Sequence, residues 1–218
     1  PKIKAGEVVL EVTDEIRYHN NRPTYHIIGS GRTIGLLNIF YKVRDRYESY
    51  IDEQGLFSWN FIRNTREGSY KRKDNVAFIH KKNMAIGEHG SSKIPDFAQD
   101  ILSAIYYFRS LDFSETQPGD EYNMDFFLDD SVYVSRIKFL GREVVQTSFG
   151  GISCLKFKPR VLVGPVFTEP YPLTIWLSDD RNHIPVMVVS KVLVGSVKVE
   201  LTDFYGLFNE DGHQQKKK

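Results

Sequence analysis

The stretch from Tyr41 to Asp52, YKVRDRYESYID, alternates between two kinds of side chain with a period of two residues. One face carries Tyr41, Val43, Asp45, Tyr47, Ser49 and Ile51, and the other is mostly charged. Successive side chains of a β-strand point to opposite faces, so the alternation indicates a half-buried strand. Because the pattern recurs along most of the 218 residues, the chain is expected to be mainly β.

The same pattern predicts further strands, separated by turns rich in Gly, Pro, Asn and Asp. They are expected at 7–13, 24–30, 56–66, 70–73, 75–80, 122–128, 132–140, 152–160, 173–178, 185–192 and 196–203. Residues 81–93 are polar and glycine-rich, which is typical of a loop. Residues 33–40, TIGLLNIF, have helical or irregular apolar spacing and are expected to cover one end of a sheet.

One convincing helix is predicted at about 95–110. Pro95 precedes Asp96, a suitable N-cap, and Phe97, Ile101, Ala104, Ile105 and Phe108 follow at helical spacing. A single helix with a wide apolar stripe must pack against a sheet. The predicted fold is therefore a single curved antiparallel sheet, a spiral β-roll or half-barrel, wrapped on this helix. Residues 1–208 are expected to form one domain, and 209–218 a flexible basic tail.

Composition excludes some classes of function. The 29 basic and 28 acidic side chains nearly cancel, so no global field recruits nucleic acid or a membrane surface. No run approaches the roughly 20 apolar residues of a membrane helix. The single cysteine, Cys154, excludes an intrachain disulfide, and its alternation with Ile152 predicts an inert core thiol.

Motifs for catalysis, metals and cofactors are weak. The histidines are scattered, and His80 and His89 are expected to be a surface pair flanking a loop. The glycines of Gly29-Ser30-Gly31 lack the context of a phosphate-binding loop. An acid/base site at Asp179-Asp180 is conceivable with His183 nearby, but hairpin-turn chemistry is favoured there and at Asp129-Asp130. No catalytic residue, metal ligand or cofactor is expected.

Asp45 interrupts the apolar face of its strand. Arg44 and Arg46 point to the other face, so its partner must come from another strand or from backbone N–H groups. A structural role is favoured over a ligand-directed one, and Asp45→Asn is expected to cost about 1–3 kcal/mol if the carboxylate is paired.

A basic stripe is also expected if the strands at 132–140 and 152–160 pair. Its members would be Arg136, Lys138, Lys156, Lys158 and Arg160. A solvated outer face is the favoured reading of that stripe, and an anionic-ligand groove is the alternative.

Several segments resemble a bacterial family of exported proteins, domain of unknown function 3108. They are Lys4-Ala5-Gly6-Glu7, YKVRDRYESYID, the helical DILSAIYYFR at 100–109, WLSDD at 176–180 and HIPV at 183–186. The resemblance implies export and a curved β-roll similar to periplasmic lipoprotein carriers, which hold acyl chains in a half-barrel around helices. Family members usually have another strand before the Ala-Gly-Glu segment, so the chain is expected to begin partway into the domain, after a secretory signal.

The function expected is non-enzymatic binding or transport of a hydrophobic or amphipathic envelope ligand, such as a lipid or lipoprotein acyl chain. Candidate ligand-binding residues are Asp45, Tyr47, Trp59, Phe61, Phe126 and Trp176. The alternative is a polysaccharide- or protein-binding envelope module that uses exposed tryptophans. A glycan hydrolase acting through Asp45 or Asp179 is least favoured. An apolar cavity would support ligand binding, and an interior packed by Phe61, Phe78, Phe126 and Ile105 would oppose it.

Overall fold

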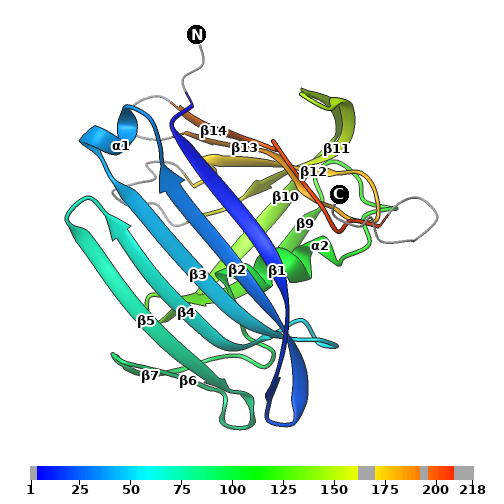
Figure 1. Ribbon diagram of the computed structural model, residues 1–218. Coiled ribbons are helices and arrows are strands. Elements are labelled where there is room, and N and C mark those ends of the chain that lie inside the picture. Colours follow the sequence, from blue (N-terminus) through cyan, green and yellow to red (C-terminus); the bar gives the residue numbers. More distant parts are fainter. Residues whose placement is uncertain (1–3, 162–169, 192–195, 209–218) are drawn as a thin grey trace. The chain divides into compact units, whose positions relative to one another are not determined.

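The computed structural model of the protein describes residues 4–161, 170–191 and 196–208 (Figure 1). Its strands form two seven-stranded sheets, which are not closed into a barrel in the described part of the chain. The prediction of a mainly β fold with one main helix is confirmed. The tail expected at 209–218 lies outside the described residues.

The first sheet follows the order of the sequence, and its strands pair antiparallel. It contains β1 (Gly6–His19), β2 (Arg22–Thr33), β3 (Val43–Asp52), β4 (Ser58–Glu67), β5 (Tyr70–Ile79), β6 (Met84–Gly87) and β7 (Gly90–Lys93). The two strands predicted at 70–80 are one strand, β5. The loop predicted at 81–93 is wrong, because β6 and β7 form a hairpin there after the short 3₁₀ turn η1 (His80–Lys82).

The second sheet also keeps neighbours in sequence side by side. It contains β8 (Gln99–Asp100), β9 (Glu121–Leu128), β10 (Ser131–Thr147), β11 (Gly150–Pro159), β12 (Leu173–Ser178), β13 (Pro185–Lys191) and β14 (Ser196–Glu200). The β8–β9 pair is parallel. Lys138 lies opposite Lys158, and Arg160 donates its N–H to the carbonyl of Arg136 at 2.7 Å, so the predicted basic stripe does form.

The chain divides into two compact units. The first comprises Pro1–Phe108 and Asp125–Tyr133, and the second comprises Arg109–Met124 and Val134–Lys218. In the first unit, Phe61, Phe78 and Phe127 form one buried cluster, and Ile27, Ile51 and Leu102 form another. In the second unit, Val145, Cys154, Trp176 and Val186 pack together.

The main helix α2 (Ile101–Arg109) is shorter than predicted at its N-terminal end. Asp96 does not cap it: residues 96–97 form a turn in which Phe97 has a left-handed φ of 54°. Asp100 provides the N-terminal cap of α2 instead. It is fully buried, its Oδ1 accepts the N–H groups of Leu102 and Ser103, and its Oδ2 accepts the hydroxyl of Ser49 on β3 at 2.5 Å. The carboxylate therefore starts the helix and ties it to the first sheet.

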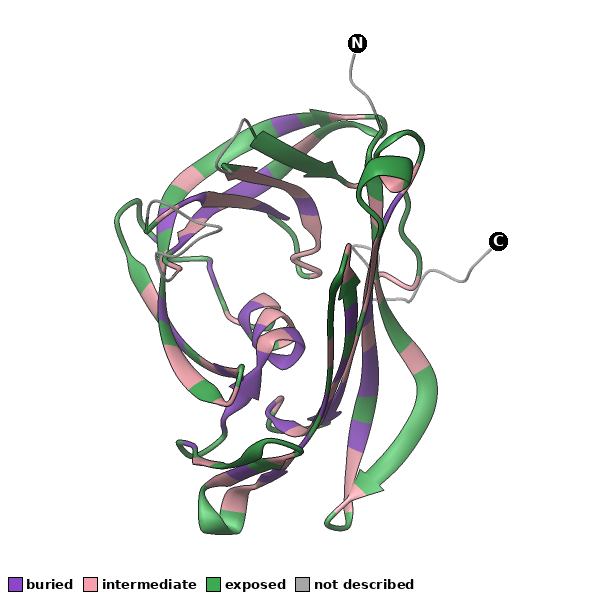
Figure 2. Cartoon of the chain, turned by 90° about the vertical axis from the view of Figure 1, so that its left-hand side faces the viewer, coloured by how far each residue is buried: buried purple, intermediate pink, exposed green. Residues whose placement is uncertain are grey.

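The short helix α1 (Leu37–Phe40) contradicts the expectation that residues 33–40 cover one end of a sheet. None of its residues is buried, and Figure 2 shows it mostly exposed, whereas α2 is mostly buried or half-buried. The apolar side chains of α1 point into solvent.

Candidate functional site

The face of the first sheet that packs against α2 carries the main sequence candidates, and it is called the inner face here. Strand register places its side chains in rows across β1 to β5. One row reads Val8, Gly31, Asp45, Thr65, Arg72; the next reads Leu10, Gly29, Tyr47, Arg63, Asp74; the third reads Val12, Ile27, Ser49, Phe61, Val76. Each of the first two rows therefore runs from an apolar residue through a glycine to polar groups.

Helix α2 covers one half of the inner face. Ile27, Phe61 and Leu102 are almost completely buried there, and a Cβ on Gly29 would lie only 2.9 Å from the side chain of Leu102. The first row is more open. Val8 is 59% exposed, and a Cβ on Gly31 would meet no atom within 4 Å. We call the segment around Val8, Gly31 and Asp45 the open half of the inner face.

Two carboxyl groups meet on the open half. Asp45 Oδ1 accepts the backbone N–H of Arg66 at 3.1 Å, so the prediction of a partner from another strand is confirmed. The same carboxyl is hydrogen-bonded to the side chain of Glu67. Partial burial raises the pKa of both groups, and the charge of Asp45 raises that of Glu67 further. Such a pair favours a shared proton.

Tyr47 stands at the border between the open and covered halves. Its ring lies 6.1 Å from that of Phe61, and its pKa is raised to about 12, first by burial and then by the charge of Asp45. The phenol therefore stays protonated over the physiological range and can donate a hydrogen bond.

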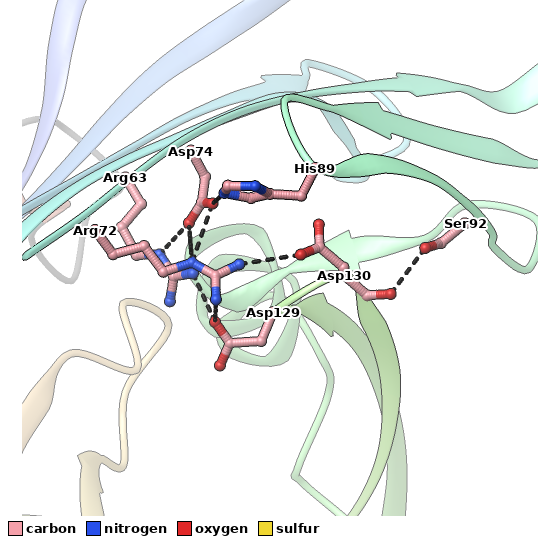
Figure 3. Close-up of polar contacts among 7 residues, drawn as sticks. All are labelled: Arg63, Arg72, Asp74, His89, Ser92, Asp129 and Asp130. Atoms are coloured by element: carbon pink, nitrogen blue, oxygen red, sulfur yellow. Dashed lines mark hydrogen bonds and ion pairs between the residues drawn. The ribbon is translucent and has the colours of Figure 1, made fainter.

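Figure 3 shows an ion network that the sequence reasoning missed. Its member Arg63 lies opposite Tyr47 in the strand register. Arg63 is 7% exposed and donates from Nε to Asp74 and from Nη2 to Asp129, both at 2.6 Å. Burial alone would lower the pKa of the guanidinium, but the two aspartates raise it. Arg72 binds Asp74 at 2.9 Å and Asp130 at 3.1 Å. The alternation of β4, which places Arg63 two residues after Phe61, was the signal that could have identified this arginine.

The network fastens several elements of the first unit. Asp129 and Asp130 form the predicted β9–β10 turn, and both have a left-handed φ. Ser92 of β7 donates its hydroxyl to the carbonyl of Asp130 at 2.8 Å, and His89 lies 3.5 Å from Asp74 (Figure 3). All the carboxylates here face cations, so the arrangement is a structural clamp rather than an acid/base pair.

The six sequence candidates do not gather at one place. Asp45, Tyr47 and Phe61 share the inner face, but Phe61 belongs to the packed cluster. Trp59 lies toward the other end of β4, where its indole N–H donates to Asp52 at 3.0 Å. The remaining two are Phe126, half-buried with its ring 5.7 Å from that of Tyr133, and Trp176, which lies in the second unit. The Trp176 indole donates to Glu143 at 2.5 Å.

In the second unit, Asp179, Asp180 and His183 line an open hollow of about 260 Å³ together with Asp112. Each carboxylate is engaged: Asp112 accepts the Ser114 N–H at 2.9 Å, and Asp179 lies 3.2 Å from Arg142. Burial alone would raise the pKa of Asp180, but hydrogen bonds from Ser178, Asn182 and His183 hold it below its usual value. A general acid needs the opposite shift, so the geometry supports the predicted turn.

His80 and His89 do not form the surface pair expected from the sequence, because His80 is half-buried. His80 packs against Phe57 and Trp59, and donates its Nε2–H to the carbonyl of Ser58 at 2.6 Å. Burial lowers its pKa. Within residues 4–161, 170–191 and 196–208, no three His, Cys, Asp or Glu side chains are placed to hold a metal ion. The helices in those ranges are also too short or too polar to cross a bilayer.

Comparisons with known proteins agree with this fold. The structure is similar to the crystal structure of a β-barrel-like protein of domain of unknown function DUF1849 from Brucella abortus. The TM-score is 0.58 at 11% identity, over 90% of this chain and 86% of that chain, so the likeness shows the fold alone. None of the curated proteins matches. A family model described as "Protein of unknown function (DUF3108)" matches residues 2–202. That match spans nearly the whole sequence, and the chain therefore belongs to the DUF3108 family.

Proposed function

We propose that the protein is an exported component of the bacterial envelope that binds an amphipathic ligand, without catalysis, on the open half of the inner face. The proposal rests on the open space next to Gly31 in β2. A glycine inside a strand often marks the close approach of another group. Packing against Leu102 accounts for Gly29, whereas a Cβ on Gly31 would have no described atom within 4 Å beyond its chain neighbours.

The neighbours of Gly31 suit a ligand with an apolar chain and a polar end. Val8 lies opposite it on one side and Asp45 on the other. Apolar side chains of β1 would contact an acyl chain. The carboxyl pair of Asp45 and Glu67, with the Tyr47 hydroxyl, would hydrogen-bond a head group. Because Phe61 and Phe78 are packed solid, the ligand would lie on the open half and not beneath α2.

A bulky side chain at residue 31 would occupy the proposed ligand site, so a substitution there tests the proposal. Gly31→Leu adds a side chain where a Cβ meets nothing, so folding is expected to survive while binding of a dansyl-labelled fatty acid weakens by at least about tenfold. Ser30→Leu, on the opposite face of the same strand, is the matched control and should bind as the wild type does. Failure of the wild-type protein to bind the probe, or equal binding by Gly31→Leu with an unchanged melting temperature, would refute the site.

The alternative envelope-binding module has less support, because both indole N–H groups are committed to carboxylates and Trp176 is only 7% exposed. Export is proposed on the family resemblance and is tested separately. The full-length precursor fused to a reporter that is active only outside the cytoplasm should give signal. A reporter that stays silent while the fusion accumulates in the cytoplasm would contradict export.

A further inference from the structure

Among the described residues of the first unit, the segment between β2 and β3 carries the most exposed apolar side chains. Phe40 is 83% exposed and Ile39 74% exposed. Together with Leu36, Leu37 and Tyr41 they form five apolar residues within six positions, which we call the apolar knuckle. A contiguous exposed apolar patch of this kind marks an interaction site more often than an ordinary surface.

The knuckle is held in shape by its polar residues. The Thr33 hydroxyl donates to the carbonyl of Tyr41 at 3.0 Å and accepts the N–H of Val43 at 2.9 Å. Arg44 donates to the side-chain oxygen of Asn38 at 2.8 Å. The polar side chains of this segment therefore make hydrogen bonds within the protein, while its apolar side chains are exposed. A loop that only faces water would show the opposite arrangement.

A row of cations crosses the outer face of the same sheet. Arg32, Arg44, Arg66 and Lys71 lie directly opposite one another on β2 to β5. Like charges in this register destabilise a sheet. Glu7 neutralises Arg32 at 2.7 Å, but the described residues offer no carboxylate within 4 Å of the cationic groups of Arg44, Arg66 or Lys71. An anionic partner outside the chain would account for this grouping.

The knuckle includes α1, which lies at the end of the first sheet where β3 begins (Figure 1). Strand register places the cation row at the same end. Gly68, in the turn between β4 and β5, donates its N–H to the carbonyl of Lys42 at 2.9 Å. A Cβ on Gly68 would lie 3.0 Å from the ring of Tyr41. Tyr70, which is 53% exposed, adds a further aromatic ring beyond this turn.

We propose that this end of the first unit docks on the surface of an anionic phospholipid bilayer. The knuckle would enter the interface between head groups and acyl chains. The exposed cations Arg66 and Lys71 would face lipid phosphates, whereas Arg44 is held by its hydrogen bonds to the knuckle. Exposed apolar and aromatic side chains flanked by Lys and Arg bind such interfaces, each basic residue adding electrostatic attraction. This surface is distinct from the ligand site proposed at Gly31, on the opposite face of the sheet.

Vesicle flotation tests the proposal with the whole chain. Wild-type protein is expected to float with phosphatidylcholine vesicles that contain phosphatidylglycerol, to bind pure phosphatidylcholine much more weakly, and to lose binding as salt rises. The double variant Ile39→Ser/Phe40→Ser should weaken binding by at least about tenfold because it removes the inserted apolar groups. Arg66→Gln/Lys71→Gln should weaken it by about tenfold and reduce the salt dependence.

Two controls separate docking from general effects. Ile16→Ser/Tyr18→Ser removes two apolar groups, 67% and 71% exposed, at the other end of β1 and should float as the wild type does. Gly31→Leu should also float normally. An environment-sensitive label on Phe40→Cys should shift to shorter wavelength on anionic vesicles. The proposal is wrong if the wild type does not float, if both lipid compositions bind equally, or if the control pair loses as much binding as the knuckle pair.

Discussion

Asp45 illustrates what side-chain alternation can and cannot predict. The pattern placed it on the inner face and implied a partner from another strand or a backbone N–H, and Arg66 supplies that N–H. Its second partner, Glu67, was not predictable. Which residue of β4 lies near Asp45 depends on the register of pairing, and a slip of one residue would turn every side chain to the other face.

The Asp45–Glu67 pair changes the expected outcome of Asp45→Asn. Both folded-state pKa values lie above those of the unfolded chain, so the folded state binds more protons over that interval. The pair therefore lowers the free energy of unfolding as pH rises from about 4. Asp45→Asn keeps an acceptor for the Arg66 N–H and removes the repulsion. It should be neutral or slightly stabilising at pH 7, by less than about 1 kcal/mol, in place of the loss expected from sequence.

Urea unfolding at several pH values measures whether Asp45→Asn raises or lowers the free energy of unfolding. The difference between variant and wild type should grow in the variant's favour as pH rises through the window. Glu11→Gln, on the exposed face of β1, is the control and should show no such trend. A clear loss of stability at neutral pH would instead support a conventional paired carboxylate.

Cys154 is a second residue whose role follows from burial. It has no exposed surface, and burial raises the pKa of its thiol to about 11. A thiolate is the reactive form, so the folded protein should react with a maleimide far more slowly than the protein unfolded in guanidinium. Labelling followed by mass spectrometry measures both rates. Equal rates would mean that the thiol is accessible, contrary to the structure.

Among the elements, the β4–β5 pair depends on Arg63. Replacing it with Met should leave Asp74 and Asp129 with Arg72 as their remaining cation and cost about 1–3 kcal/mol. Arg66→Met changes the neighbouring, exposed arginine on the outer face of the same strand and should cost less than about 1 kcal/mol. Urea unfolding of both variants measures the contrast. Similar losses would show that the network adds little beyond the packing of a long side chain.

The start of α2 gives a test that separates the predicted cap from the observed one. Asp100→Ala removes two helix N–H partners and the acceptor for the Ser49 hydroxyl, which should cost about 2–3 kcal/mol. Asp96→Ala, at the position that local pattern favoured, should cost less than about 1 kcal/mol because its side chain binds only Asn83 at an exposed site. Chemical denaturation of both variants checks the order, and the reverse order would restore Asp96 as the cap.

Element type was more predictable than element boundaries. Strand β12 occupies the predicted residues 173–178, because its apolar alternation ends sharply at a turn. The sequence predicts a loop at the β6–β7 hairpin because GEHGSSK has no apolar alternation. Its strand character comes from pairing with β5, which local sequence does not encode. Likewise, α1 has apolar spacing that suggests burial, but only the tertiary structure shows that none of its residues is buried.

At the scale of the whole molecule, a net charge of +1 conceals an uneven distribution. Lys71→Glu would place opposite charges across from each other at Arg66 and should raise stability by about 0.2–1 kcal/mol. The same change should weaken binding to anionic vesicles. Urea unfolding and flotation of this one variant measure both effects. A variant that loses stability would show that the cations in the row do not repel one another.

The order of the strands has a further consequence, for the rate at which the chain folds. Within each sheet the strands pair in sequence order, and apart from the parallel β8–β9 pair, which is joined through α2, the pairs are antiparallel between strands consecutive in the chain. Closing the loops between consecutive strands costs less entropy than the long crossovers of Greek-key sandwiches, and low contact order goes with fast folding. Each hairpin can serve as a nucleus to which the next strand adds. A chain built in this way should reach its native pairing quickly for its β content, exposing unpaired strand edges only briefly.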